Sequence, residues 1–276
     1  MNKHLQKYND NILKKNKEER IGVERYNNQG SLMKIVEYYG CHDIIVEFQD
    51  EWKYRTHAQL TQFNDGRIKN PYYPVVFNIG IIGELNTMID NKTQTKEFRT
   101  WYEMMRRCYS QDFKEISPTY QNVTCCNEWN YYPNFYEWLH KQNNFDIWKN
   151  QKLSCLDKDI LSKNNKIYSP NTCLLVPHCV NTLFTKREKD RGDYPIGVSL
   201  NKNKGNFKVS VSRIKNGKYR YKSFGNYPTP EDAFYFGYKP AKEKHIKEIA
   251  KEEYEKGTIT KQCYEAMMNY KVEITD

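Results

Sequence analysis

The chain has 276 residues, a formal net charge of +10, 38% hydrophobic residues and a mean hydropathy of −0.95. This length allows one large domain or two to three small ones, and the low apolar fraction argues against one large core. No apolar run approaches the roughly 20 residues that cross a bilayer, so no membrane partner is expected.

The first 83 residues divide into two predicted parts. Residues 1–20 are almost wholly polar and predict a mobile or weakly helical extension. Residues 21–83 predict a small β-domain, because β-rich runs alternate there with turn signals. We expect its strands over Leu32–Tyr38, Ile44–Phe48 and Trp52–Thr56.

Residues 97–185 predict an α+β middle domain. Trp101, Met104, Met105 and Cys108 fall at helical spacing. This pattern predicts a helix with one apolar face near the start of the domain, followed by a loop-rich stretch.

Residues 194–256 predict a three-stranded antiparallel sheet packed on a helix. The strand patterns are followed by short turns, of which Asn216–Gly217 is the strongest hairpin signal in the chain. The three predicted strands cover Ile196–Leu200, Phe207–Arg213 and Lys218–Phe224. The expected fold class is therefore α+β, with several domains.

The predicted C-terminal helices have clear start signals. Thr229 suits an N-cap, since Pro230 and acidic residues follow it. Pro240 lies inside this helix and is expected to kink it. Residues 257–276 predict a second helix, over Lys261–Asn269, and a tail.

Eight cysteines are scattered along the chain without Cys-x-x-Cys spacing. The N-terminus is polar and charged and does not resemble a signal peptide, so reduced intracellular thiols are expected. A zinc site remains an alternative, with Cys108, Cys126, Cys155 and Cys173 as its ligands.

The predicted sheet is strongly basic. Residues 194–230 contain no acidic side chain, and this block indicates a nucleic-acid partner, whereas the alternative is a solvated face kept for solubility. Alternation places Lys208, Ser210 and Ser212 on the open face of the middle strand. A twisted sheet of this width can enter the DNA major groove.

Residues 194–253 resemble the ethylene-response-factor (Apetala-type) DNA-binding domain. The resemblance rests on Gly197-Val198, Phe207, Phe224-Gly225-Asn226-Tyr227 and the Thr229–Ala233 helix start. It implies that the sheet lies in the major groove. By position it implies DNA contacts from Ser199, Asn201, Lys204, Ser210, Ser212, Tyr221 and Ser223; the basic block adds Lys202, Lys208, Arg213 and Lys218. The plant proteins carry arginine or tryptophan at most of the positions implied by the resemblance.

The middle domain resembles HNH-type, homing-endonuclease-like phage proteins, which often carry the same Apetala-type domain. The matching motifs are Trp101–Tyr109, Glu128-Trp129, Phe135–Trp138, Leu156–Ile160 and Tyr168–Cys173. An active HNH site needs a histidine base and a metal ligand on the following helix.

The HNH-like site departs from that pattern. Lys158 stands at the histidine position and Thr172 at the later asparagine position. Lysine is a poor base near neutral pH, so the resemblance implies a degenerate site. If cleavage occurs, Asp157 and Asp159 are the candidates to hold Mg²⁺, whereas DNA binding requires no cofactor.

Three functions remain open. The first is a phage-derived protein that binds double-stranded DNA, in which the sheet recognises sequence and the HNH-like segment holds the backbone. The alternative is a metal-dependent HNH-like nicking or homing endonuclease. The third is a phage counter-defence protein that binds a host nuclease or nucleoprotein complex. All three imply the cytoplasm of an infected or lysogenic bacterial host cell.

Overall fold

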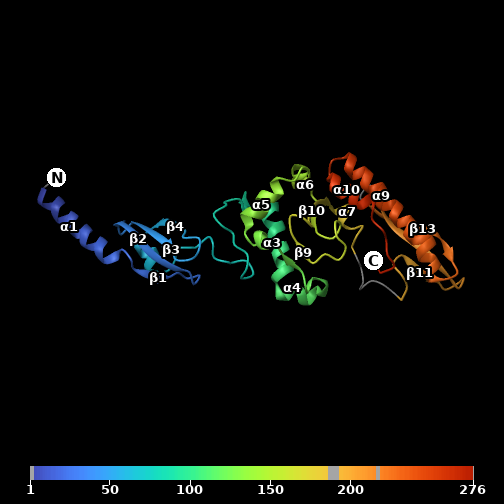
Figure 1. Cartoon of the computed structure of the whole chain (residues 1–276), viewed down its shortest axis with the longest axis horizontal. Helices are drawn as coiled ribbons and strands as arrows, with labels where there is room; N and C mark the ends of the chain where they lie inside the picture. The colour runs from blue at the N-terminus through green and yellow to red at the C-terminus, as the bar shows by residue number, and fades with distance from the viewer. Residues whose placement is uncertain (1–2, 186–192, 216–217, 276) are drawn as a thin grey trace. The chain divides into compact units, whose positions relative to one another are not determined.

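The computed structural model describes residues 3–185, 193–215 and 218–275, with side chains for residue 6 and for 11–185, 193–212 and 222–275. The chain is α+β and contains several small, separate sheets (Figure 1). It divides into two compact units. The first comprises Met1–Ile89 with Asn130–Pro133, and the second comprises Asp90–Trp129 with Asn134–Asp276.

The first unit is built on a four-stranded antiparallel sheet whose strands follow one another in chain order. Alternate residues of its central strands, such as Met33, Ile35, Ile44 and Val46, are buried and form its core. Its elements are α1 (Lys3–Arg20), β1 (Glu24–Tyr26), β2 (Leu32–Gly40), β3 (Asp43–Phe48), β4 (Arg55–Ala58) and α2 (Leu60–Asn64).

The strand predicted over Trp52–Thr56 starts later than expected. The Asp50 carboxylate accepts a hydrogen bond from the Trp52 amide at 3.0 Å, and Lys53 has φ of 49°. Both features belong to a turn, so the strand starts only at Arg55.

The second unit begins with helices that pack an aromatic core. The predicted apolar face of α3 (Lys96–Tyr109) is confirmed, because Trp101, Met104, Met105 and Cys108 are fully buried. Other short elements of this part are β5 (Ile89–Asp90), β6 (Thr93–Gln94), α4 (Gln111–Ile116), η1 (Pro118–Tyr120), β7 (Thr124–Cys125), η2 (Asn127–Asn130), α5 (Tyr132–His140) and α6 (Phe145–Asn150).

A two-stranded antiparallel hairpin follows these helices. It pairs β8 (Ser154–Asp157) with β10 (Leu174–Pro177), and α7 (His178–Asn181) comes directly after β10. The long loop between the two strands contains β9 (Ile167–Tyr168), which pairs in parallel with β7. The Lys158–Asp159 dipeptide thus begins a loop at the end of a buried strand.

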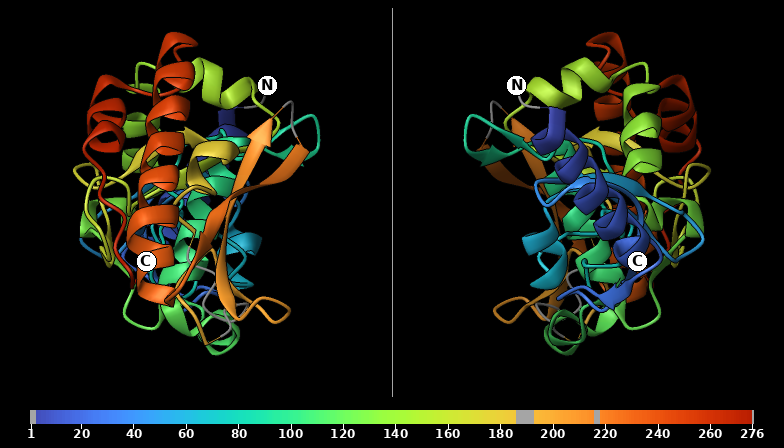
Figure 2. Two further views of the ribbon diagram at one scale, coloured as in Figure 1. Left: turned by 90° about the vertical axis from the view of Figure 1, so that its right-hand side faces the viewer. Right: turned by 90° about the vertical axis from the view of Figure 1, so that its left-hand side faces the viewer.

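The C-terminal part is the predicted three-stranded antiparallel sheet with a helix against one face (Figures 1 and 2). Val209 and Val211 are buried on the helix side, which confirms the predicted alternation. The strands are β11 (Val198–Asn201), β12 (Asn206–Lys215) and β13 (Lys218–Tyr227); the helices are α8 (Pro230–Asp232), the π-helix η4 (Ala233–Tyr238), α9 (Lys239–Glu255) and α10 (Lys261–Met268). The predicted turn at Asn216–Gly217 lies outside the described residues.

The start of the long helix agrees with prediction, and its interruption has a specific form. The Thr229 hydroxyl accepts from the Asp232 amide at 3.1 Å, as an N-cap does. The helix passes through the π-helical turn η4 before Pro240. In an α-helix the amide of residue 240 would donate to the Phe236 carbonyl, but Pro240 has no amide hydrogen. The Tyr227 hydroxyl donates to this carbonyl at 3.3 Å.

Segments predicted as separate domains share one buried core within the second unit. Leu174, Val176 and Val180 from the hairpin region pack with Val209 and Phe234 from the sheet and its helix. The buried Asn144 side chain adds a polar link, since its Nδ2 donates to the carbonyls of Leu175 (2.9 Å) and Thr258 (2.8 Å). In the described part of the chain, no helix is long and apolar enough to span a membrane.

Candidate nucleic-acid interface

The open face of the three-stranded sheet is defined by strand pairing. Cross-strand partners share a face, so pairing extends the face from β12 to its neighbours. Lys208 pairs with Ser199 on β11 and with Asn226 on β13, which makes one row of three side chains. Ser210 pairs with Ser223 in the next row.

All of these open-face side chains reach solvent at least in part. Lys208 is exposed and Ser210 is half-buried, whereas Val209 between them has no exposed surface. The predicted contact residues Ser199, Lys202, Lys204 and Ser223 are exposed, and Asn201 and Ser212 are half-buried. The structure thus brings these predicted residues onto one face and the adjoining turn. The side chains of Arg213, Lys218 and Tyr221 lie outside those described.

Asn226 is an open-face residue that the sequence analysis did not select. Two residues of β13, Phe224 and Gly225, lie opposite the single residue Val209, and Gly225 has φ of 107°. This bulge shifts the alternation by one residue, so Asn226 rather than Gly225 pairs with Lys208. Strict period-two counting from Ser223 could not have found it.

Three described lysines of this face and its turn have no acidic partner among the described residues. Among the described residues, no carboxylate lies within 4 Å of the ammonium groups of Lys202, Lys204 or Lys208. Elsewhere lysines are commonly paired. Examples are Lys34–Glu24, Lys141–Glu137, Lys149–Glu97, Lys158–Asp159 and Lys256–Glu252. The face therefore presents positive charge that the described part of the protein does not neutralise.

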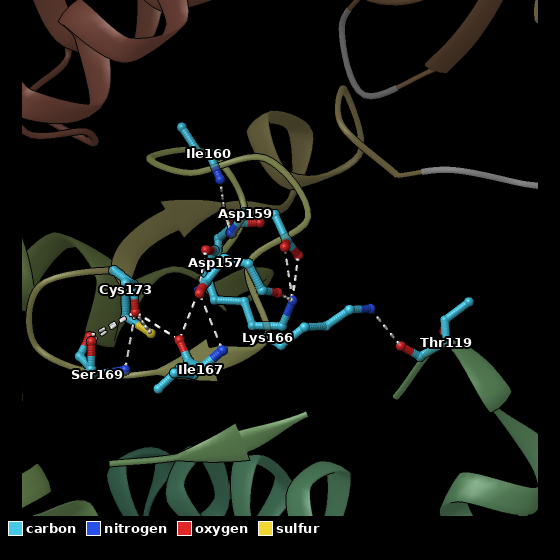
Figure 3. Close-up of polar contacts among 11 residues, drawn as sticks. Thr119, Asp157, Asp159, Ile160, Lys166, Ile167, Ser169 and Cys173 are labelled. Atoms are coloured by element: carbon cyan, nitrogen blue, oxygen red, sulfur yellow. Dashed lines mark hydrogen bonds and ion pairs between the residues drawn. The ribbon is translucent and has the colours of Figure 1, made fainter. Parts of the chain in front are cut away.

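The second candidate site is the loop after β8, where Asp157 acts as a cap (Figure 3). Its Oδ1 accepts hydrogen bonds from the amides of Asp159 and Ile160, both at 2.9 Å. Asp157 is only 7% exposed, and this burial raises the pKa of its carboxyl group. Its contacts are those of a residue that fixes the loop.

Lys158 is also fully engaged within the loop. Its Nζ lies 2.8 Å from both carboxylate oxygens of Asp159 and donates to the Asn165 carbonyl at 2.7 Å. The Asn165 side chain returns a hydrogen bond to the Lys158 carbonyl at 2.9 Å. The lysine at the expected histidine position thus neutralises its neighbour and closes the loop.

Thr172 does not lie with these residues in a common cavity. Its hydroxyl donates to the Ile167 carbonyl at 2.8 Å and accepts from the Ser169 amide at 3.1 Å, so it closes a turn. Asn181 of α7 lines the same two cavities, of about 380 and 260 Å³, as Asp157–Asp159. The sequence analysis missed Asn181, although its place on the first helix after the hairpin was a usable signal.

These residues do not fit a Mg²⁺ ion. The Lys158 ammonium lies on the Asp159 carboxylate, where it supplies the positive charge that a metal would bring, and Asp157 is directed to backbone amides. In the described parts of the chain, no group of three or more His, Cys, Asp or Glu side chains could hold a metal ion. None of the eight cysteines, all of which are described, forms a disulfide, and no zinc cluster brings Cys108, Cys126, Cys155 and Cys173 together among these residues.

Comparison with protein-family models, with curated proteins and with solved structures found no match to this chain.

Proposed function

We propose that this chain is a double-stranded DNA-binding protein whose three-stranded sheet lies in the major groove. The loop after β8 has a structural role in this proposal, and binding requires no metal. The resemblance to phage homing-endonuclease-like proteins supports a site of action in the cytoplasm of an infected or lysogenic bacterial cell.

The observation that carries the proposal is the unpaired charge of the sheet. A lysine without an acidic neighbour raises the local potential and attracts polyanions. Lys202, Lys204 and Lys208 are gathered on one open face and its turn, next to small hydroxyl and amide side chains. Lysine contacts to DNA phosphates release bound counterions and thereby increase affinity.

The test is fluorescence anisotropy of the full chain with duplex DNA, titrated with salt. The double variant Lys204→Ala/Lys208→Ala removes two proposed phosphate contacts. Because each contact contributes about 0.9 to the slope of log K against log salt, the slope should become shallower by about 2.

The matched control is Lys141→Ala/Lys261→Ala, which removes the same charge from two exposed positions, just after α5 and at the start of α10, that are paired with Glu137 and Glu265. We expect its salt slope to stay at the wild-type value. An equal loss of slope in both variants would show that only net charge matters. An unchanged slope in Lys204→Ala/Lys208→Ala would remove the sheet from the DNA interface.

The same titration with Mg²⁺ separates the alternatives. Intact DNA is expected, because the loop has no free carboxylate pair for a metal. Metal-dependent cleavage that disappears in Asp157→Asn would establish the endonuclease instead. Failure to bind any bare duplex would overturn the proposal and leave a host nucleoprotein complex as the partner to test.

A further inference from the structure

Among the side chains that the structure describes, those at the centre of the open sheet face are serines. Ser210 and Ser223 face each other across β12 and β13, and Ser212 follows two residues later on β12. On the β11 side, the Ser210 amide donates to the carbonyl of Gly197. Glycine has no side chain, so Gly197 adds no longer group to the row of Ser210. The part of the face that would enter deepest into a groove thus carries short hydroxyl side chains.

A serine hydroxyl discriminates poorly between base pairs. It both donates and accepts a hydrogen bond, so it can meet either kind of group on a base edge. Strong discrimination comes from bidentate contacts, such as arginine or lysine to guanine and asparagine to adenine. None of the described side chains in the serine rows can make such a contact.

The groups with greater reach lie around the serines. Lys202 and Lys204 lie in the turn between β11 and β12, and Asn201 pairs with Asn206 at the start of that turn. Lys208 and Asn226 lie in the next row of the open face, between this turn and the serines. A lysine ammonium or an asparagine amide in such a peripheral position suits phosphates and sugars, which carry no sequence information.

We infer that the sheet binds B-form duplex DNA with little preference for base sequence, the lysines supplying affinity through phosphates and the serines fitting any base edge. This inference rests on the proposed function and differs from the expectation that the sheet recognises a defined sequence. Choice of a target site would then depend on another part of the chain or on a partner.

The test uses the full chain and a duplex library with a randomised centre, sequenced before and after binding. We expect all sequences to be retained within about tenfold of one another. One good bidentate contact discriminates by about 5- to 150-fold at its base pair, and several such contacts multiply to well beyond tenfold. Enrichment of one motif by about a hundredfold or more would overturn the inference. A protein that retains no duplex at all would overturn the proposed function, which is a separate outcome.

A gain-of-specificity variant gives the second readout. Ser223→Arg places a guanidinium in the central row and should create a guanine preference of about 5- to 150-fold at one position. The matched control is Tyr235→Arg, which adds the same charge at a half-exposed position of η4, on the helix that covers the opposite face. Its affinity should change equally for all sequences.

The outcome of Ser223→Arg decides whether this face meets bases. If Ser223→Arg and Tyr235→Arg give the same unselective binding, the serine rows do not contact base edges and the inference is wrong. Ser210→Arg, the cross-strand partner position, repeats the test independently of any local effect at residue 223.

Discussion

Lys208 on the sheet and Lys158 in the β8–β10 loop both belong to segments that the sequence connects with DNA, yet their surroundings differ. Lys208 is exposed and has no carboxylate within 4 Å among the described residues, whereas Lys158 is 7% exposed and contacts both oxygens of Asp159. The number of basic residues in a segment therefore does not show how many positive charges remain available to a partner. That depends on whether the fold has already neutralised them.

Removal of each lysine should therefore affect a different property. An exposed, unpaired lysine contributes little to folding, while its charge remains available to a polyanion. A buried, paired lysine contributes to folding, because its removal leaves the partner carboxylate and carbonyl without a donor. Four substitutions sharpen or break this contrast, from the largest expected effect to the smallest.

Asp157→Ala should give the largest change. It leaves the buried amides of Asp159 and Ile160 without their acceptor, so the free energy of unfolding should fall by about 2–3 kcal/mol. Urea denaturation measures this loss. Asp157→Asn keeps one carbonyl oxygen and should lose less, and DNA affinity of the folded protein should not change in either variant. Equal denaturation midpoints for wild type and Asp157→Ala would show that the loop does not depend on this cap.

Lys242→Met tests a third situation, a half-buried lysine that no described carboxylate pairs with. Burial lowers the pKa of Lys242 to about 8, and no described carboxylate pairs with it. Since the unfolded chain keeps its proton up to the ordinary pKa of 10.5, the free energy of unfolding should rise with pH between about 8 and 10.5. Replacement by methionine removes the buried charge and should stabilise the protein at neutral pH by about 1–2 kcal/mol.

The control for Lys242→Met is the pH profile itself. Thermal unfolding of wild type and variant should differ most below pH 8 and converge towards higher pH, because the wild-type lysine is then neutral in the folded state. A constant difference across this range would mean that packing rather than charge causes the effect.

Lys158→Met should lower the free energy of unfolding by about 1 kcal/mol. This loss is smaller than that for a fully buried ion pair, because Asp159 is partly exposed and water can hydrate its carboxylate. Its effect on the salt slope of DNA binding should be negligible. A shallower slope of the size expected for a phosphate contact would place the loop at the DNA interface and break the comparison.

Lys208→Met should leave the free energy of unfolding within about 0.5 kcal/mol of wild type, as substitutions at exposed positions usually do. It should reduce the salt slope of duplex binding by about 1. Chemical denaturation and anisotropy on the same preparation measure both quantities. A destabilised Lys208→Met with unaltered DNA binding would reverse the assignment of the two lysines.

Much of the local structure could be predicted from residue patterns. The alternation of Phe207–Ser212 gave the middle strand and its faces, and the Thr229 signal gave the start of the helix. The helical spacing of Trp101, Met104, Met105 and Cys108 predicted the buried face of α3. These features depend on contacts between residues that are close in sequence, so the order of residues along the chain is enough to predict them.

The candidate sites required the tertiary structure. The bulge at Gly225 moved Asn226 onto the open face, and the chain path placed Asn181, but not Thr172, among the residues that line the same two cavities as Asp157. The place of Asn181 on the helix after the hairpin was a signal in the sequence, but strand pairing and cavity lining themselves do not follow from spacing, because they join residues far apart in the chain.

The sequence by itself determined where the basic block lies, which residues alternate in it and that a lysine replaces the expected histidine. Only the tertiary structure decided which of these charges are free. Whether an ammonium group meets a carboxylate depends on the fold of the loop or sheet around it, and a Coulomb interaction weakens with distance in space, not with separation along the chain. Lys158 has an aspartate on either side in the sequence and Lys208 lies in a block without acids, but only the fold shows that Asp159 pairs with Lys158 and that no described carboxylate lies within 4 Å of Lys208.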